Sequence, residues 1–83
     1  MAMMNVKVNL YNGVKYESTS EKVAEVKYNN IRGYEVVTGE RAVEIGNMTD
    51  EASRDEYNEY LIITLNDGDT ATFCNSYVDL FRI

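Results

Sequence analysis

The last third of the chain, residues 60–83, constrains the fold more than any other stretch. An apolar run, Leu61–Leu65, meets the turn Asn66-Asp67-Gly68, and short alternating segments follow, broken once at Asn75-Ser76. Alternation of apolar and polar residues with period two is typical of strands, and an asparagine, aspartate and glycine sequence favours a tight turn. This stretch therefore predicts a hairpin followed by a further strand.

The N-terminal residues 5–18 repeat this outline. Val6, Val8 and Leu10 share one face of an alternating segment, and Asn12-Gly13 supplies turn chemistry. A three-residue loop keeps the apolar residues together, because it sets Leu10 opposite Val14 and Val8 opposite Tyr16. We expect a hairpin in that register.

A further hairpin is predicted in the middle of the chain. Asparagine tolerates positive φ, so Asn29-Asn30 predicts a turn. Gly33–Thr38 and Arg41–Ile45 then form two short strands about Gly39-Glu40, where glycine permits a tight bend.

Two segments admit two interpretations each. Residues 18–28 contain a capping-box pair, Ser18 with Glu21, which favours a helix, but the alternating Ala24, Val26 and Tyr28 favour a strand, and we prefer the strand. Residues 47–59 break the alternation, and a short acidic helix or a long loop fits them equally.

The predicted fold class is mainly β. We expect a small antiparallel curved sheet or a barrel-like meander of glycine-turn hairpins, with one short acidic helix at about residues 49–58 as an option. The alternative is an α+β fold with a helix at about residues 20–28. The chain of 83 residues has room for one domain, residues 1–83.

The residue types argue against catalysis. The sequence has no histidine, which removes the commonest proton shuttle and metal ligand, and its single cysteine, Cys74, has no base close to it in sequence. The Asn66–Asp69 turn lacks the later bidentate carboxylate of a calcium loop. We therefore expect no catalytic, metal-binding or cofactor-binding residues and no enzymatic activity.

The sequence also predicts the cellular compartment. The lack of paired cysteines, and of a charged and then apolar leader at residues 1–4, favours the reducing cytoplasm. No apolar run approaches the roughly 18–20 residues that span a bilayer, so no membrane partner is expected.

Charge and tyrosine content indicate where a partner would bind. The net charge is −6, and all of the excess negative charge lies from Gly46 onward. Such a field repels nucleic acid and favours basic partners. Tyrosine is enriched at protein interfaces, and two tyrosines lie in or beside the acidic stretch. The predicted partner-binding residues are Asp50, Glu51, Asp55, Glu56, Tyr57, Glu59 and Tyr60.

These features predict a non-enzymatic protein-binding module that docks on a basic surface of a partner protein. In size, acidity and lack of catalytic residues the chain is similar to small phage-borne inhibitors of host defence such as anti-CRISPR proteins. That resemblance implies inhibition by covering a basic channel on the target. The alternative is a self-associating structural or accessory subunit of a phage or bacterial assembly, in which strand edges pair to form a homo-oligomer.

Overall fold

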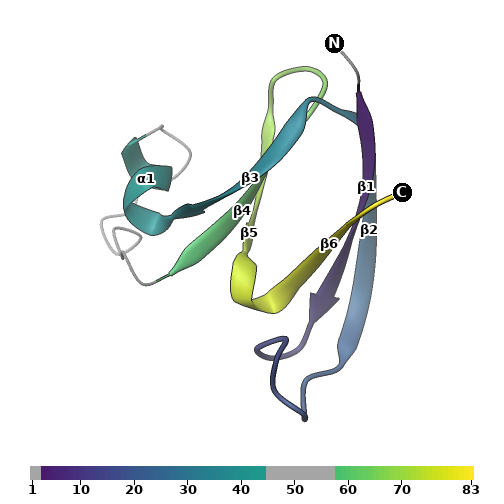
Figure 1. Ribbon diagram of the computed structural model, residues 1–83, viewed down its shortest axis with the longest axis vertical. Coiled ribbons are helices and arrows are strands. Elements are labelled where there is room, and N and C mark those ends of the chain that lie inside the picture. Colours follow the sequence, from purple (N-terminus) through teal and green to yellow (C-terminus); the bar gives the residue numbers. More distant parts are fainter. Residues whose placement is uncertain (1–2, 45–57) are drawn as a thin grey trace.

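The computed structural model describes residues 3–44 and 58–83 and shows a mainly β fold (Figure 1). Two three-stranded antiparallel sheets have the orders β2-β1-β6 and β3-β4-β5. The elements in chain order are β1 (Met4–Tyr11), β2 (Lys22–Ile31), β3 (Gly33–Thr38), α1 (Gly39–Glu44), β4 (Glu59–Thr64), β5 (Thr70–Cys74), the 3-10 turn η2 (Asn75–Tyr77) and β6 (Val78–Arg82). The predicted fold class is confirmed, as sheets that do not close into a barrel.

The C-terminal hairpin forms as predicted. β4 and β5 pair antiparallel with Ile63 opposite Ala71. The turn contains Gly68 at φ +94°, a conformation that favours glycine, and Asp69 N–H donates to the side chain of Asp67 at 3.0 Å. The last strand does not pair with this hairpin. After η2, β6 crosses to the other sheet and lies beside β1, with Leu80 opposite Val8.

The predicted N-terminal hairpin is wrong in register and partner. β1 pairs with β2, so that Val8 lies opposite Val26 and Leu10 lies opposite Ala24. Residues 12–21 form a loop, closed where Asn12 N–H donates to the Glu21 carbonyl at 3.0 Å. The ten-residue loop is preferred over a three-residue loop because it lets β1 pair with the long strand β2. The preferred strand for residues 18–28 is confirmed from Lys22 onward, and the alternative helix at about 20–28 is wrong.

The predicted hairpin about Gly39-Glu40 is also wrong. Gly39–Glu44 is the helix α1, which begins where the Thr38 hydroxyl accepts a hydrogen bond from Arg41 N–H at 3.2 Å. β3 pairs instead with β4. The side chain of Ala42 is fully buried, so tertiary packing stabilises this short helix.

The predicted turn at Asn29-Asn30 is a distortion inside β2. Both asparagines belong to the strand, although Asn30 has φ +56°, which asparagine tolerates. The chain passes from one sheet to the other at Arg32, between β2 and β3. Of the optional acidic helix at about 49–58, only Asn58 is described, and it lies in no helix; the rest lies outside the described part of the chain.

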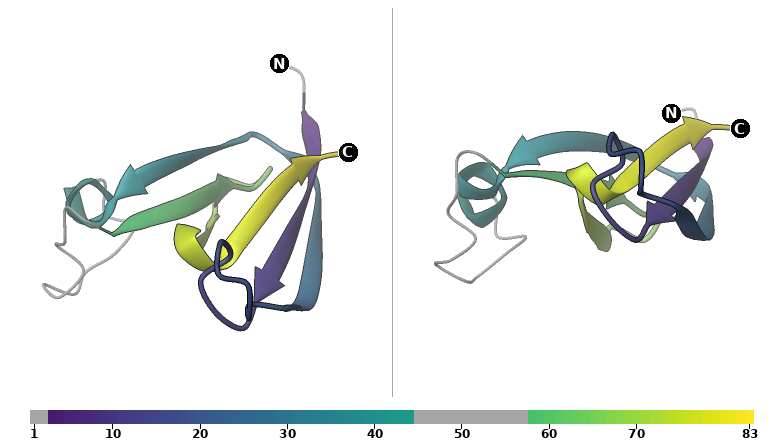
Figure 2. Two further views of the ribbon diagram at one scale, coloured as in Figure 1. Left: turned by 60° about the horizontal axis from the view of Figure 1, so that its bottom comes forward. Right: turned by 90° about the horizontal axis from the view of Figure 1, so that it is seen from below.

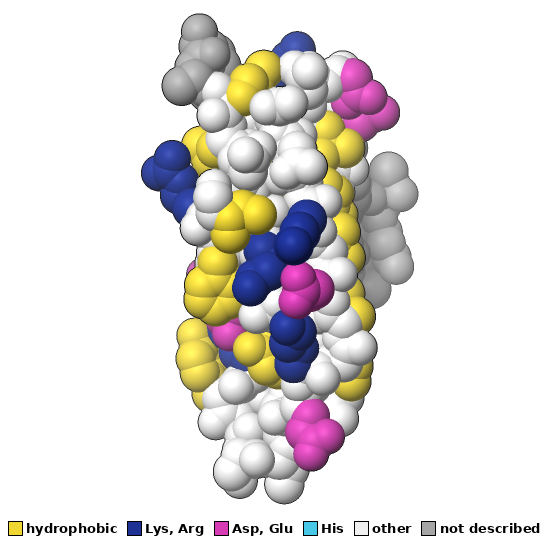
Figure 3. Space-filling model, turned by 90° about the vertical axis from the view of Figure 1, so that its right-hand side faces the viewer, with side chains coloured by type: hydrophobic (Ala, Val, Ile, Leu, Met, Phe, Trp, Pro, Cys, Tyr) yellow, Lys and Arg dark blue, Asp and Glu magenta, His cyan; other side chains and the backbone are white. Residues whose placement is uncertain are grey.

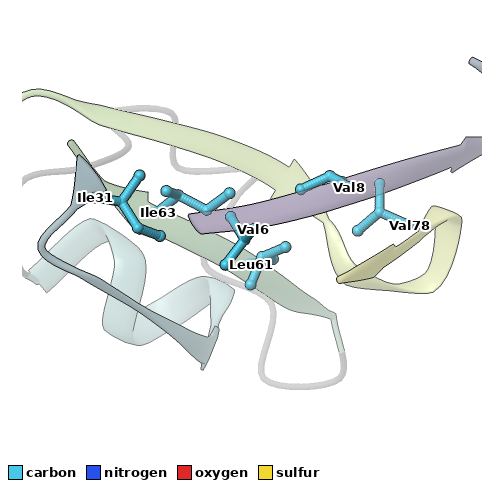
Figure 4. Close-up of a cluster of buried hydrophobic side chains, with 6 residues drawn as sticks. All are labelled: Val6, Val8, Ile31, Leu61, Ile63 and Val78. Atoms are coloured by element: carbon cyan, nitrogen blue, oxygen red, sulfur yellow. The ribbon is translucent and has the colours of Figure 1, made fainter. Parts of the chain in front are cut away.

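One apolar cluster joins the two sheets (Figure 4). Alternating residues of β1 and β4 point toward each other, and the ends of β2 and β6 complete the cluster. Each fully buried aliphatic side chain contributes roughly 1.5–3 kcal/mol. The buried members are Val6, Val8, Ile31, Leu61, Ile63 and Val78. Except for Ile31, the buried members therefore come from the alternating segments that the sequence identified at both ends of the chain.

Candidate functional site

The structure describes two of the seven predicted partner-binding residues. Glu59 is exposed at the start of β4, where it lies opposite Thr38 of β3. Tyr60 is half-buried and lies between Val37 and Cys74 on the neighbouring strands. The other five, Asp50, Glu51, Asp55, Glu56 and Tyr57, lie outside the described residues.

Helix α1 brings further acids beside Glu59. Gly39 N–H donates to the Asn58 carbonyl at 3.0 Å, so the helix begins next to the start of β4. Glu40 and Glu44 are exposed on this helix, and Glu44 has a weak ion pair of 3.4 Å with Arg41. We call α1 together with the start of β4 the acidic end (left in Figure 1).

The acidic end belongs to a chain segment that carries the whole net charge. Residues 33–59 contain eight acidic residues and two arginines, which equals the net charge of −6 of the entire protein. The remaining residues hold six acids and six bases. Counting the charge from Gly46 onward splits this segment, because Glu35, Glu40 and Glu44 precede Gly46. The pairing of Thr38 with Glu59 and the contact of Gly39 with Asn58 bring Glu40 and Glu44 beside Glu59, whereas Glu35 lies opposite Ile62 further along β3.

The outer face of sheet β2-β1-β6 has the opposite character. Lys7 and Lys27 lie directly opposite each other on β1 and β2, and Lys22 Nζ lies 2.8 Å from Glu25 Oε1. A hydrogen bond from Lys22 and its charge, with smaller contributions from Lys7 and Lys27, hold the pKa of Glu25 below its usual value near 4.5. Figure 3 shows this gathering of basic side chains. Sequence reasoning missed it because the three lysines come from two strands.

Exposed tyrosines lie at a second place, around the loop 12–21. Tyr16 is 84% exposed and Tyr77 is 43% exposed. Lys15 holds the loop against the chain near Tyr77, since its N–H donates to the Ser76 carbonyl at 2.8 Å and its ammonium donates to the Val78 carbonyl at 2.9 Å. Half-buried Tyr28 packs edge-to-face on Phe73, with ring centroids 6.4 Å apart. The tyrosines thus divide between the core margin and the surface.

The described residues offer little for chemistry. A pocket of about 330 Å³ lies where the chain passes between the sheets, lined by Arg32, Gly33, Tyr34, Glu35 and Thr64. It is open and contains one carboxylate, so it presents no acid–base pair. Within residues 3–44 and 58–83, no three histidine, cysteine or acidic side chains lie where they could hold a metal ion. No helix in the described part of the chain is long and apolar enough to cross a membrane.

The observations that remain are therefore surfaces: an acidic end, a basic sheet face, and the exposed Tyr16 and Tyr77 around the loop 12–21. Comparison of the chain with protein-family models, curated proteins and solved structures found no match.

Proposed function

We propose that the protein is a non-enzymatic binding module whose acidic end docks on a basic surface of a partner protein. One observation carries the proposal: residues 33–59 hold the entire net charge, while the rest of the chain is electrically balanced. Exposed acids that lie together, as Glu40, Glu44 and Glu59 do at the acidic end, orient the molecule during encounter and raise the rate of association with a basic surface.

The geometry supports a protein partner at this end. Glu40 and Glu59 are exposed and have no ion pair within the described residues, so their charge is available to a partner. The half-buried Tyr60 follows Glu59 and adds an aromatic group next to the charges. Aromatic anchors surrounded by charged residues are typical of protein interfaces.

We infer further that the module acts as an inhibitor in the cytoplasm, of the phage-borne, anti-CRISPR-like kind. The support is the resemblance in size, acidity and lack of catalytic residue types. An inhibitor of that kind would cover a basic, nucleic-acid-binding channel on its target, and the acidic end has the charge that such a surface attracts.

Affinity capture with matched variants tests the proposal. The double variant E40K/E59K reverses two charges at the acidic end, and E17K/E21K makes the same change in charge on the loop 12–21, where both side chains are exposed. We expect the wild type and E17K/E21K to retain the same basic partner and E40K/E59K to lose it. Equal recovery by both variants would contradict the proposal.

A second variant extends the test to the predicted residues before β4. Reversing Asp55, Glu56 and Glu59 to lysine should also abolish capture, and raising the salt concentration should weaken wild-type binding. If this triple variant binds as well as the wild type, the acidic stretch is not the docking surface. Thermal melting of each variant controls for loss of fold.

The second candidate is a self-associating structural or accessory subunit. The observation that favours it is the outer edge of β2, with which no strand of the described residues pairs and which is independent of the acidic end.

A further inference from the structure

Strand β2 forms an outer edge of its sheet. Its ten residues, Lys22–Ile31, pair on one side with β1, and no described strand pairs with the other side. Both views of Figure 2 show this strand at the margin of the molecule. Most of its residues are exposed, including Val23, which is 63% exposed. Unpaired backbone groups on such an edge can pair with another strand.

The regular part of β2 is a short window, residues 24–28. The pairing with β1 is continuous from Ala24 to Tyr28, and register shifts interrupt it on both sides. Positive φ at Asn30 marks a further distortion beyond the window. A strand that adds to this edge therefore has five regular residues to pair with, and Val26 is at their centre.

The window is self-complementary about Val26. On the outer face, Glu25 and Lys27 flank the centre with opposite charges. We propose that β2 pairs antiparallel with β2 of a second copy across a two-fold axis at Val26, which places Glu25 of each copy opposite Lys27 of the other. Opposite charges at directly paired positions stabilise a sheet, and a two-fold axis makes the same contact twice.

The charges also select this register. Sliding the copies by two residues in one direction sets Glu25 against Glu25, and sliding them in the other direction sets Lys27 against Lys27. Like charges at directly opposite positions are destabilising. An edge that carried only lysines would repel a second copy. Glu25 instead provides a negative charge that attracts Lys27 of the other copy.

The side chains on the apolar face of the sheet fit the same register. Ala24, Val26 and Tyr28 lie opposite Leu10, Val8 and Val6 of β1, so they share the apolar face of the sheet. Across the axis, the small Ala24 lies opposite the large Tyr28, and Val26 lies opposite itself. A small residue facing a large one allows the side chains to interdigitate. The dimer would carry a six-stranded sheet and two acidic ends. This inference does not depend on docking through the acidic end, and it specifies the contact of the second candidate function.

Charge-reversal variants test the register directly. The wild type, E25K, K27E and the double variant E25K/K27E are compared by sedimentation velocity at low salt, across micromolar to low-millimolar concentrations, because an edge contact is smaller than a standard interface. The monomer mass is 9.5 kDa, and a dimer has twice that mass. E17K, an exposed change on the loop 12–21, is the control for charge alone.

We expect the wild type, E17K and the double variant to dimerise. Each single variant should weaken the dimer at least about tenfold, because two attractive pairs become two repulsive ones. An equimolar mixture of E25K and K27E should recover dimerisation, since each reversed charge then faces an opposite one. This mixture also shows that the single variants are folded. The proposal is overturned by a monomeric wild type, by single variants that dimerise as the wild type does, or by a mixture that stays monomeric.

Discussion

The ammonium group of Lys15 is expected to hold the loop 12–21 in place, and replacing it with methionine tests this role. The Lys15 side chain is 10% exposed, and its Nζ lies 2.9 Å from the Val78 carbonyl and 3.4 Å from Asp79 Oδ1. Methionine keeps most of the apolar stem and removes the charged donor. The Lys15→Met variant therefore isolates the polar contacts from the packing.

The expected cost follows from these contacts. A hydrogen bond that involves a charged group contributes roughly 1.5–3 kcal/mol. The ion pair adds little, because the Asp79 side chain is 36% exposed and water screens it. We therefore expect Lys15→Met to lower the free energy of unfolding by about 2 kcal/mol. For a domain of this size, that loss lowers Tm by about 8–16 °C.

Urea unfolding followed by circular dichroism measures the effect, with Lys27→Met as the matched control. Lys27 is exposed and has no ion pair within the described residues, so at a concentration where the protein is monomeric its replacement should change the free energy by less than about 0.5 kcal/mol. High salt should leave the difference between the two variants largely intact, because the bond to the Val78 carbonyl is shielded from solvent. Equal stabilities of Lys15→Met and the wild type would refute the reasoning.

Three further predictions address the core, a buried amide and acid titration. Ile63→Ala should cost about 2–5 kcal/mol in urea unfolding, because Ile63 is fully buried in the cluster that joins the sheets; Ile83→Ala, at a residue 60% exposed, should be nearly neutral. Asn9→Val should leave the free energy of unfolding unchanged or raise it by up to about 1 kcal/mol, because buried Asn9 Oδ1 accepts no hydrogen bond from any residue in the described part of the chain; a clear loss of stability would show that the amide has a structural partner. The pKa of Glu25 is lowered in the folded protein, so its contribution to stability is present above the unfolded pKa and is lost as pH falls through the folded value, below about 4.5. Lys22→Met should move this pKa back toward 4.5 in an NMR titration, and an unchanged pKa would exclude Lys22 as its main cause.

The parts of the fold that depend on neighbouring residues were predictable. The β4–β5 hairpin follows from an apolar run and a glycine turn, since the turn brings adjacent segments together with little loss of chain entropy. The alternation at Ala24, Val26 and Tyr28 correctly favoured a strand. These segments contain their own structural information.

Strand partners were less predictable, because they depend on residues far apart in the chain. Asn12-Gly13 has good turn chemistry, yet β1 pairs with β2 across a ten-residue loop. Gly39 fits a hairpin turn as well as a helix start, and the partner of β3 begins only at Glu59. The same limit applies to the site. Glu40 and Glu44 could be grouped with Glu59 only after β3 and β4 were paired.

The measurement that tests the central claim most directly is an NMR titration of the isotopically labelled protein with an oligolysine peptide as the basic probe. We expect the largest chemical-shift changes at α1 and the start of β4, around Glu40, Glu44 and Glu59, and we expect them to diminish as salt is added. Changes centred on Glu17 and Glu21 in the loop 12–21, or spread evenly over the exposed acids, would contradict the claim that the acidic end is the docking surface.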